Sequence, residues 1–341
     1  MLKILGIGQG KFIPSYRYRL KEVVNDFYKQ NVHLSLFETD ISSYPPKNKV
    51  YRLYWIIRVL INRLPLIISQ YNYDIIILQR EMISTLYTIE RFLKIPYIMD
   101  VDDAIHLNQK KYSIDKIAKK ASAVVVCNEF LSNYYSKLHE NVYIIPTPVN
   151  TEKYRPKSKK NIKQITIGWI GTSSNFKSLK SIEKELSILL EKHPNIILKV
   201  VSNNNPNFTL IEKSRYIFKK WSDIDDVEDI QSFDIGIMPL LDTEHSRGKC
   251  AFKMLQYMSC GLPVVSSDLP MNRKIVEMRE CGFCVSKKDD WINALTVLSQ
   301  SQSKREVMGN EGRKTIEQFY STKVYVKLYK NVILNVLSKG N

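Results

Sequence analysis

Short runs of hydrophobic residues alternate along the chain with longer stretches in which hydrophobic residues recur every three or four positions. The short runs predict buried strands, and the longer stretches predict helices. In the first half, strands are predicted at 3–7, 32–37, 74–79, 96–100, 123–127 and 142–146. In the second half, they are predicted at 165–170, 196–201, 235–239 and 263–266. Strands that alternate with helices are typical of a mostly parallel sheet covered on both faces, so the expected fold class is α/β.

A polar segment interrupts this pattern near the middle of the chain. Residues 151–163 are rich in lysine and contain a proline, as linkers between domains often do. The alternation of strands and helices starts again after it, so domains are predicted at 1–150 and 164–320. The length of 341 residues suits two cores better than one. Hydrophobic residues at helical spacing predict that residues 321–341 form a packed C-terminal helix.

Composition and charge narrow the function classes. Hydrophobic residues make up 44% of the chain and charged residues 25%, which excludes a wholly disordered, collagen-like or coiled-coil protein. The formal net charge of +17 predicts a surface that attracts phosphate groups. Because no tail, arm or single helix concentrates the basic residues, the pattern argues against nucleic acid as the partner.

The cysteines and the N-terminal residues predict a cytoplasmic protein. Five cysteines are an odd and sparse set, which fits reduced thiols better than a disulfide framework. Cys281 and Cys284 have the spacing of a redox pair, but no thioredoxin-like unit begins there, so we interpret both as packed apolar side chains. The N-terminal residues lack a signal-peptide core, and no stretch of about 18 uncharged apolar residues occurs.

A basic and aromatic segment lies between residues 41 and 73, where the sequence has no acidic residue. Its basic residues are Lys47, Lys49, Arg52, Arg58 and Arg63. One interpretation is a helix that rests on anionic lipid headgroups, which would place the protein peripherally on the inner face of the plasma membrane. The other is a helix packed on the sheet of its own domain, with basic side chains that reach solvent. The sequence leaves both open.

Three glycines follow the first predicted strand. Gly6, Gly8 and Gly10 are similar to a dinucleotide-binding fingerprint, but the third glycine comes one position too early. A dehydrogenase is therefore a distant alternative. A tight turn that lets another molecule approach the backbone needs only the glycines. We expect Gly8, Gly10 and Arg17 to lie in an acceptor or cleft loop.

The strongest chemical signal lies between residues 233 and 267. The pattern predicts a strand, a polar loop that ends in Arg247, Gly248 and Lys249, a helix over 250–259, and another strand. Because free N–H groups at a helix start and basic side chains favour an anion, a phosphate is expected here. Gln256, further along the predicted helix, can bond sugar hydroxyls. The alternative is that the basic side chains are only solvated.

Several segments give the chain a resemblance to a known family. The run Gly168-Trp-Ile-Gly-Thr-Ser-Ser-Asn-Phe-Lys177 and the segment 233–267 resemble the donor domain of GT-B glycosyltransferases of family 4, the glycosyl transferases group 1. Residues 1–150 resemble their acceptor domain more loosely, through 14–19, 74–80 and 100–104. The resemblance implies two Rossmann-like domains facing across a cleft, with the C-terminal helix packing back.

The chain departs from the family pattern where the donor diphosphate binds. The family supplies two cations from a Gly-Arg-Leu-x-x-x-Lys stretch. Here Thr172 stands in place of the arginine, whereas Lys177 matches the lysine. We infer that Lys249 replaces the missing arginine, together with Arg247 or Lys253.

A second departure concerns two glutamates that bind sugar and ribose in the family. Gly248 occupies the first of these positions and Gln256 the second. The segment from Gly248 to Met258 is most similar to a subgroup that carries Gly-Lys-Cys-x-Phe-Lys-x-Leu-Gln-Tyr-Met instead. The departures leave a second function open, a catalytically degraded module that binds a nucleotide-sugar without turning it over.

The resemblance implies an enzyme that transfers a sugar with retention at the anomeric carbon. The donor would be a UDP- or GDP-type nucleotide-sugar, the acceptor a glycan or lipid-linked molecule of surface polysaccharide or glycolipid biosynthesis. No cofactor and no metal ion are expected, since the nucleotide-sugar is a substrate. The candidate catalytic residues are Lys177, Lys249, Asp102 and Asp103. The candidate donor-binding residues are Gly171, Thr172, Trp221, Arg247, Gly248, Lys253 and Gln256. The two aspartates could instead cap a helix, and Trp221 could be a core residue.

Overall fold

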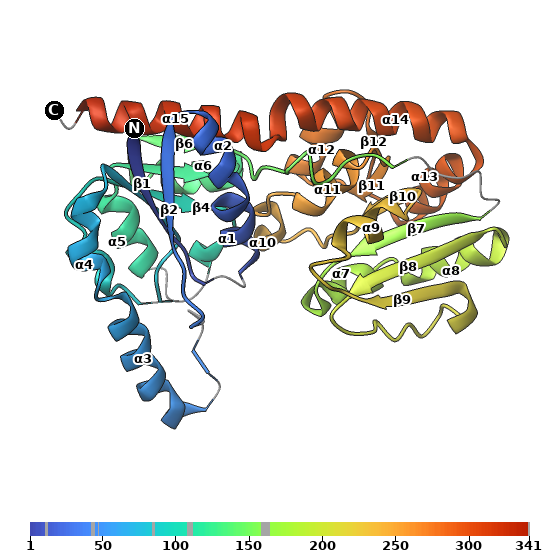
Figure 1. The fold of residues 1–341 in the computed structure, drawn as a ribbon. Coiled ribbons are helices and arrows are strands. Elements are labelled where there is room, and N and C mark those ends of the chain that lie inside the picture. Colours follow the sequence, from blue (N-terminus) through green and yellow to red (C-terminus); the bar gives the residue numbers. More distant parts are fainter. Residues whose placement is uncertain are drawn as a thin grey trace. The chain divides into compact units, whose positions relative to one another are not determined.

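The computed structural model divides into two compact units, shown in Figure 1. It describes residues 1–10, 13–41, 45–46, 48–83, 86–107, 112–157 and 164–339. Unit 1 consists of Met1–Pro148, Gly248–Cys250 and Thr322–Asn341, and unit 2 of Val149–Arg247 and Ala251–Ser321. The described part of the predicted linker, residues 151–157, lies in unit 2, and residues 158–163 lie outside the described residues.

Unit 1 is built on a parallel sheet of six strands. The order across the sheet is β2 (Val32–Phe37), β1 (Leu2–Ile7), β3 (Ile75–Gln79), β4 (Tyr97–Val101), β5 (Ala123–Val126) and β6 (Val142–Ile144). Its helices are α1 (Pro14–Arg19), α2 (Val24–Lys29), α3 (Lys49–Arg63), α4 (Leu66–Ser69), α5 (Tyr112–Lys120), α6 (Glu129–Tyr135) and α15 (Thr322–Lys339). All residues of the central strands β3 and β4 are buried, which explains why these strands appear in the sequence as continuous apolar runs.

Alternate residues of these strands enter two separate cores. Ile76 and Leu78 pack with residues of α4, α5 and α6, whereas Ile75 and Ile77 pack with residues of α1, α2 and α15. The C-terminal helix α15 therefore packs back onto unit 1, as predicted. Its buried residues in this core are Tyr325, Val326, Tyr329, Val332, Ile333 and Val336.

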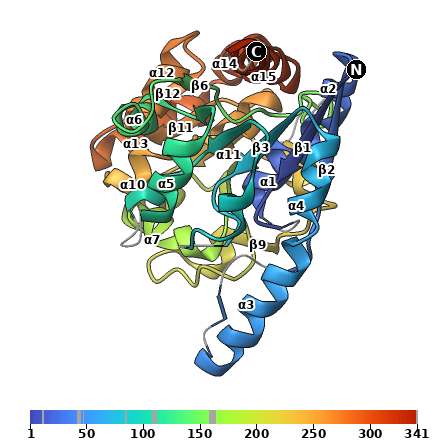
Figure 2. The same cartoon turned by 90° about the vertical axis from the view of Figure 1, so that its left-hand side faces the viewer.

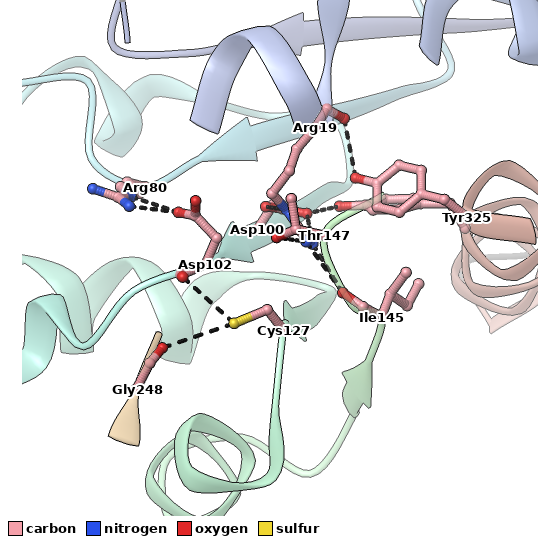
Figure 3. A network of polar contacts seen from close by, with 10 residues as sticks. Arg19, Arg80, Asp100, Asp102, Cys127, Ile145, Thr147, Gly248 and Tyr325 are labelled. Atoms are coloured by element: carbon pink, nitrogen blue, oxygen red, sulfur yellow. Dashed lines mark hydrogen bonds and ion pairs between the residues drawn. The ribbon is translucent and has the colours of Figure 1, made fainter. Parts of the chain in front are cut away.

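A buried ion pair ties α1, β4 and α15 together, as Figure 3 shows in part. Arg19 donates from Nε and Nη2 to the two carboxylate oxygens of Asp100, at 2.6 and 2.8 Å. The hydroxyl of Tyr329 donates to the same carboxylate at 2.8 Å, and the hydroxyl of Tyr325 donates to the Arg19 carbonyl at 3.0 Å. Burial alone would lower the pKa of Arg19, but Asp100 outweighs it and holds that pKa well above its ordinary value.

Unit 2 contains a second parallel sheet of six strands. The order is β12 (Gly282–Val285), β11 (Val264–Ser267), β10 (Ile235–Met238), β7 (Ile165–Ile170), β8 (Ile196–Ser202) and β9 (Tyr216–Lys220). Its helices are α7 (Phe176–Lys180), α8 (Glu183–Lys192), α9 (Asp226–Gln231), α10 (Glu244–Arg247), α11 (Phe252–Ser259), α12 (Pro270–Glu277), α13 (Lys288–Gln300) and α14 (Gln302–Thr315). The strand β7 begins the unit and lies between β8 and β10, which is the strand order of a doubly wound Rossmann sheet.

The two sheets confirm the predicted α/β class with two Rossmann-like domains. Helices α8 and α13 cover one face of the second sheet, and α9, α11 and α12 contribute to the core on the other. Neither edge strand of this sheet, β9 or β12, is among the strand ranges predicted from the sequence. The five cysteines, all within the described ranges, form no disulfide, and Cys281 is buried just before β12, in agreement with its interpretation as a packed side chain. None of the helices in the described ranges combines the length and the apolarity needed to cross a membrane.

Candidate functional site

The first strand of unit 2, β7, ends in a tight turn. Because the strand order runs outward from β7 in both directions, through β8 on one side and β10 on the other, this is the point where the order reverses. Ligands of open α/β sheets bind at the carboxyl ends of strands, at such a switch point. The Gly171 amide donates to the Val201 carbonyl at 3.0 Å, and a Cβ on Gly171 would lie 2.5 Å from the ring of Trp169. Only glycine fits there. Thr172 follows with an exposed side chain, whose Oγ1 accepts a hydrogen bond from Asn175 at 3.0 Å.

A residue that the sequence did not single out holds this turn in place. Asn203, directly after β8, accepts a hydrogen bond from the Ser173 amide at 2.7 Å. It also donates to the Ser173 hydroxyl at 3.0 Å. Lys177 lies on the short helix α7 that follows, and its side chain is exposed. The turn thus presents Thr172 and Lys177 at the carboxyl edge of the second sheet.

Trp221 follows the edge strand β9, which is separated from β7 by β8 in the sheet. Its amide donates to the Ser202 carbonyl at 2.9 Å. The side chain is 38% exposed, so the interpretation of Trp221 as a core residue is wrong. An exposed indole next to the carboxyl end of β8 can stack on a planar ring.

The prediction of a polar loop up to Lys249 and a helix over 250–259 is only partly correct, because Arg247 lies in a helix and the second helix begins two residues later. Arg247 ends the short helix α10, and α11 begins at Phe252, preceded by Ala251 in a left-handed conformation with φ 54°. The guanidinium of Arg247 forms two bonds to the Asp242 carboxylate, at 2.8 and 3.0 Å. These bonds raise the pKa of Arg247 and lower that of Asp242. Because both side chains are exposed, the pair adds little to stability.

The two polar residues predicted on α11 differ in exposure. Lys253 is partly buried in the first turn of the helix, and Gln256 is buried one turn further on. Both belong to unit 2. Residues three apart in a helix lie on neighbouring parts of its surface.

The segment Gly248–Cys250 belongs to unit 1, although it lies in the sequence between two elements of unit 2. Its backbone lies against the loops that follow β4 and β5. The Lys249 carbonyl accepts a hydrogen bond from Asn128 at 3.1 Å, and the Gly248 carbonyl accepts a weak one from the Cys127 thiol at 3.9 Å. The same thiol lies 3.4 Å from the Asp102 carbonyl (Figure 3). The structure thus brings Lys249 and Asp102 into one region of unit 1.

Close packing explains the glycine at position 248. A Cβ on Gly248 would lie 2.5 Å from the Cβ of Ala104 and 3.1 Å from its backbone nitrogen. A glutamate, as the resemblance predicts for this position, cannot be accommodated unless the backbone moves. The departure from the family pattern is therefore a consequence of how segment 248–250 packs on the loop after β4.

The candidate acidic residues of unit 1 both have structural partners. Asp102 is buried and paired with Arg80, whose Nη2 lies 2.5 Å and whose Nε lies 3.0 Å from its Oδ1. Asp103 accepts a hydrogen bond from the Ala104 amide at 2.9 Å, just before the short 3-10 helix Ile105–Leu107. Because Ala104 precedes this helix, the bond is not a helix cap, and the capping role stays a prediction. The sequence assigned no role to Arg80.

Arg80 has an unusual backbone for a residue that is not glycine. It follows β3 directly, with φ 59° in the left-handed region, and its side chain is buried. Its amide donates to the Asp100 carbonyl at 3.0 Å. Such conformations persist where surrounding contacts enforce them, and they concentrate at functional sites. The feature of the sequence that could have pointed to Arg80 is a basic residue directly after a buried strand.

The glycine turn after β1 completes this edge of the first sheet. Gly8 is buried, and Gly10 has φ 130° with its carbonyl bonded to the Ile13 amide at 3.1 Å. Between them, the Gln9 side chain donates to the Glu81 carbonyl at 3.1 Å, which joins the loops after β1 and β3. Arg17 lies on α1, stacks over the Tyr18 ring and donates to its hydroxyl.

Most of the second unit is similar to a known protein family. Residues 164–301 match the family described as Glycosyl transferases group 1. A curated relative, glycosyltransferase 1 domain-containing protein 1 of Xenopus tropicalis, is 24% identical over 161 residues. The aligned part covers 44% of this chain and 45% of that protein, so the chain spans less than half of its length.

Solved structures resemble the whole chain. Sucrose-phosphate synthase from Thermosynechococcus elongatus matches with a TM-score of 0.74 and 11% identity, over 99% of this chain and 100% of that one. HepE of Anabaena in complex with UDP and glucose matches with 0.71 and 12%, over 98% and 100%. WaaG, a glycosyltransferase involved in lipopolysaccharide biosynthesis, matches with 0.66 and 12%, over 97% and 99%. At these identities the likeness shows the fold alone, which is the GT-B fold. Together with the family match, it supports a GT-B glycosyltransferase.

Proposed function

We propose that this protein is a retaining glycosyltransferase of family 4 that moves a hexose from a nucleotide-sugar to a glycan or lipid-linked acceptor. The observation that carries the proposal is the Gly171–Ser173 turn at the switch point of a Rossmann sheet, inside the region similar to glycosyl transferases group 1. The donor is of UDP or GDP type, and the bound UDP of HepE favours UDP. The reaction needs no metal ion and serves surface polysaccharide or glycolipid synthesis in the cytoplasm.

The proposed chemistry depends on charge at the donor diphosphate. When the bond between the anomeric carbon and the phosphate oxygen breaks, negative charge grows on the leaving diphosphate. Fixed cations and N–H dipoles stabilise that charge more in the transition state than in the ground state. Lys177 and Lys249 are the cations that we assign to this role.

The acceptor side belongs to unit 1 in this proposal. A hydroxyl that attacks the anomeric carbon must lose its proton. Asp103 is the candidate to orient or deprotonate that hydroxyl, because Asp102 is committed to Arg80 at 2.5 Å. Asp102 would then act by positioning the loop after β4.

The test is a thermal-shift screen with UDP, GDP and their sugars, followed by turnover with the best donor. We expect the nucleoside diphosphate to raise the melting temperature. When an acceptor is added, the nucleotide-sugar is expected to transfer its sugar to the acceptor and to release the nucleoside diphosphate. Stabilisation without nucleotide release, across glycan and lipid-linked acceptors, would favour the binding module without catalysis. No stabilisation by any of them would contradict the donor site itself.

Substitution of Lys177 tests its role in the turnover assay. Lys177→Ala is expected to lower kcat/KM by about a hundredfold, the loss typical of one transition-state donor. The matched control is Lys184→Ala, which removes an exposed lysine from the neighbouring helix α8. Equal activity of the two variants would remove Lys177 from the mechanism.

A further inference from the structure

One helix of unit 1 exposes a continuous row of hydrophobic side chains. Along α3 the row consists of Val50, Leu53, Ile57, Ile61 and Leu64, the residue that ends the helix, and these side chains are 83, 67, 48, 61 and 50% exposed. Spacings of three and four residues place them within an arc of about 100° on one side of the helix. In Figures 1 and 2, α3 extends away from the sheet of its own unit. Monomeric proteins rarely expose an apolar stripe of this kind without a partner.

The row continues beyond α3. Ile68 of α4 is 79% exposed. It lines a shallow, almost wholly apolar hollow together with Ile61, Leu64, Pro65, Ser69 and Asn72. The exposed apolar surface therefore spans α3 and α4 rather than a single residue.

The opposite side of α3 attaches the helix to its unit. Val59 and Arg63 are its buried residues. Arg63 is fully buried, and burial lowers its pKa to about 10 despite the nearby carboxylate of Glu90. The expectation that Arg63 belongs to a basic lipid-facing surface is therefore wrong. Lys47 lies outside the described residues.

The charged residues of the segment that carries the row are all positive. Residues 41–73 contain no acidic residue. Lys49 and Arg58 are exposed, and helical geometry places them on opposite flanks of the row, each about 80–100° from its centre. The guanidinium of Arg58 lies 5.7 Å from the centre of the Tyr54 ring, which is itself 58% exposed. Tyrosines with an exposed ring and hydroxyl are typical of the boundary between headgroups and acyl chains.

We propose that α3 and α4 form a docking surface for an anionic lipid bilayer. In this arrangement the apolar row enters the headgroup region, while Lys49 and Arg58 contact lipid phosphates on either side. Charge selects this partner over a second copy of the chain, because two such faces would bring cations against cations. The inference rests on unit 1 alone and does not depend on the proposed function.

Co-sedimentation with vesicles tests the apolar part. The full chain is expected to bind vesicles of phosphatidylcholine with phosphatidylglycerol, to bind pure phosphatidylcholine weakly, and to lose binding at high salt. The variant Leu53→Ser/Ile57→Ser/Ile61→Ser should bind at least tenfold more weakly. Its control is Leu210→Ser/Ile224→Ser/Val307→Ser, which removes three hydrophobic side chains of similar or greater exposure from unit 2.

A charge variant tests the flanks. Lys49→Gln and Arg58→Gln should each weaken binding to the anionic vesicles by about fivefold. The control Lys192→Gln/Lys213→Gln removes two exposed lysines of unit 2. Thermal melts of all variants establish that they are folded, so that lost binding is not lost structure.

Three outcomes would overturn the proposal. The first is wild-type protein that stays in the supernatant with anionic vesicles. The second is equal binding by the α3 variants and their unit 2 controls. The third is a concentration-dependent dimer that the α3 serine variant abolishes, because the row would then be covered by a second copy. Binding is measured without donor or acceptor, so failure here leaves the proposed glycosyl transfer untouched.

Discussion

The glycine at position 248 is explained by its packing against residues that are far away in the sequence. Its position corresponds to a glutamate in the family that the chain resembles, and from the sequence this looked like a lost contact to sugar. In the structure, a side chain at 248 would collide with Ala104, because segment 248–250 packs on the loop after β4. The glycine is thus required by the local structure, whatever the donor contacts are.

Substitution of Gly248 should therefore destabilise the protein. Gly248→Ala places a Cβ 2.5 Å from that of Ala104, and we expect a loss of about 1–3 kcal/mol in the free energy of unfolding, measured with urea. Ala104→Gly removes the colliding atom and should recover part of the loss in the double variant. If the loss of unfolding free energy in the double variant equals the sum of the losses in the two single variants, this contact is not the cause.

Cys284 provides a prediction about pH. Burial raises the pKa of its thiol to about 11, while a contact with Ser266 opposes this. Since the thiolate is the reactive form, the alkylation rate of Cys284 should rise about a hundredfold between pH 8 and pH 10. Mass spectrometry of labelled peptides measures it, with Cys284→Ser to identify the peptide. A rate already at its plateau at pH 8 would exclude the raised pKa.

At the level of elements, the buried pair of Arg19 and Asp100 connects α1 to β4, and Tyr329 connects α15 to the same carboxylate. Arg19 is fully buried, so water could not solvate its charge if the partner were lost. Breaking such a pair leaves an uncompensated charge in the core, whereas removing both members costs much less. One carboxylate thus joins α1, β4 and α15 inside the core.

Asp100→Asn should lower the free energy of unfolding by about 3–5 kcal/mol. Tyr329→Phe should lower it by about 1.5–3 kcal/mol, because it removes one hydrogen bond to a charged group. Tyr28→Phe, at a position 64% exposed, is the control and should have almost no effect. Urea denaturation measures all three. If Arg19→Met/Asp100→Leu is as unstable as Asp100→Asn, the explanation by an unpaired charge is wrong.

The sequence predicted elements well where local patterns decide them. Continuous apolar runs located the six strands of the first sheet and four of the six strands of the second, because buried parallel strands contact helices on both faces. The two edge strands of the second sheet, β9 and β12, escaped, since no residue of β9 is buried and two of the four residues of β12 are only partly buried. Interactions between distant residues could not be predicted: Arg19 and Asp100 are 81 positions apart, and the contacts of Gly248 with unit 1 have no local signal. The exposed side of α3 was visible as a pattern, but the burial of Arg63 was not.

For the whole molecule, the decisive feature is that unit 1 is discontinuous. It contains the first 148 residues and also α15, which contributes six buried hydrophobic side chains to one of its two cores. Neither the first half of the sequence nor the predicted domain 1–150 contains them. The N-terminal unit is therefore complete only when the end of the chain is in place.

A polypeptide of residues 1–148 should consequently fail to fold cooperatively. We expect it to bind the dye ANS and to lack a sharp thermal transition, since one core lacks the side chains of α15. Addition of a peptide of residues 321–341 should restore the transition. A peptide with Tyr325, Tyr329 and Ile333 replaced by serine is the control. A sharp transition of the fragment alone would show that α15 is dispensable.

The position of α15 also has a consequence for synthesis on the ribosome. The last buried residue of α15, Val336, is translated 188 residues after Pro148. At about 5–20 residues per second, that interval lasts roughly 10–40 s. During this time one hydrophobic face of the nascent N-terminal sheet is not covered by α15. Chaperones that recognise exposed hydrophobic surfaces are expected to bind it.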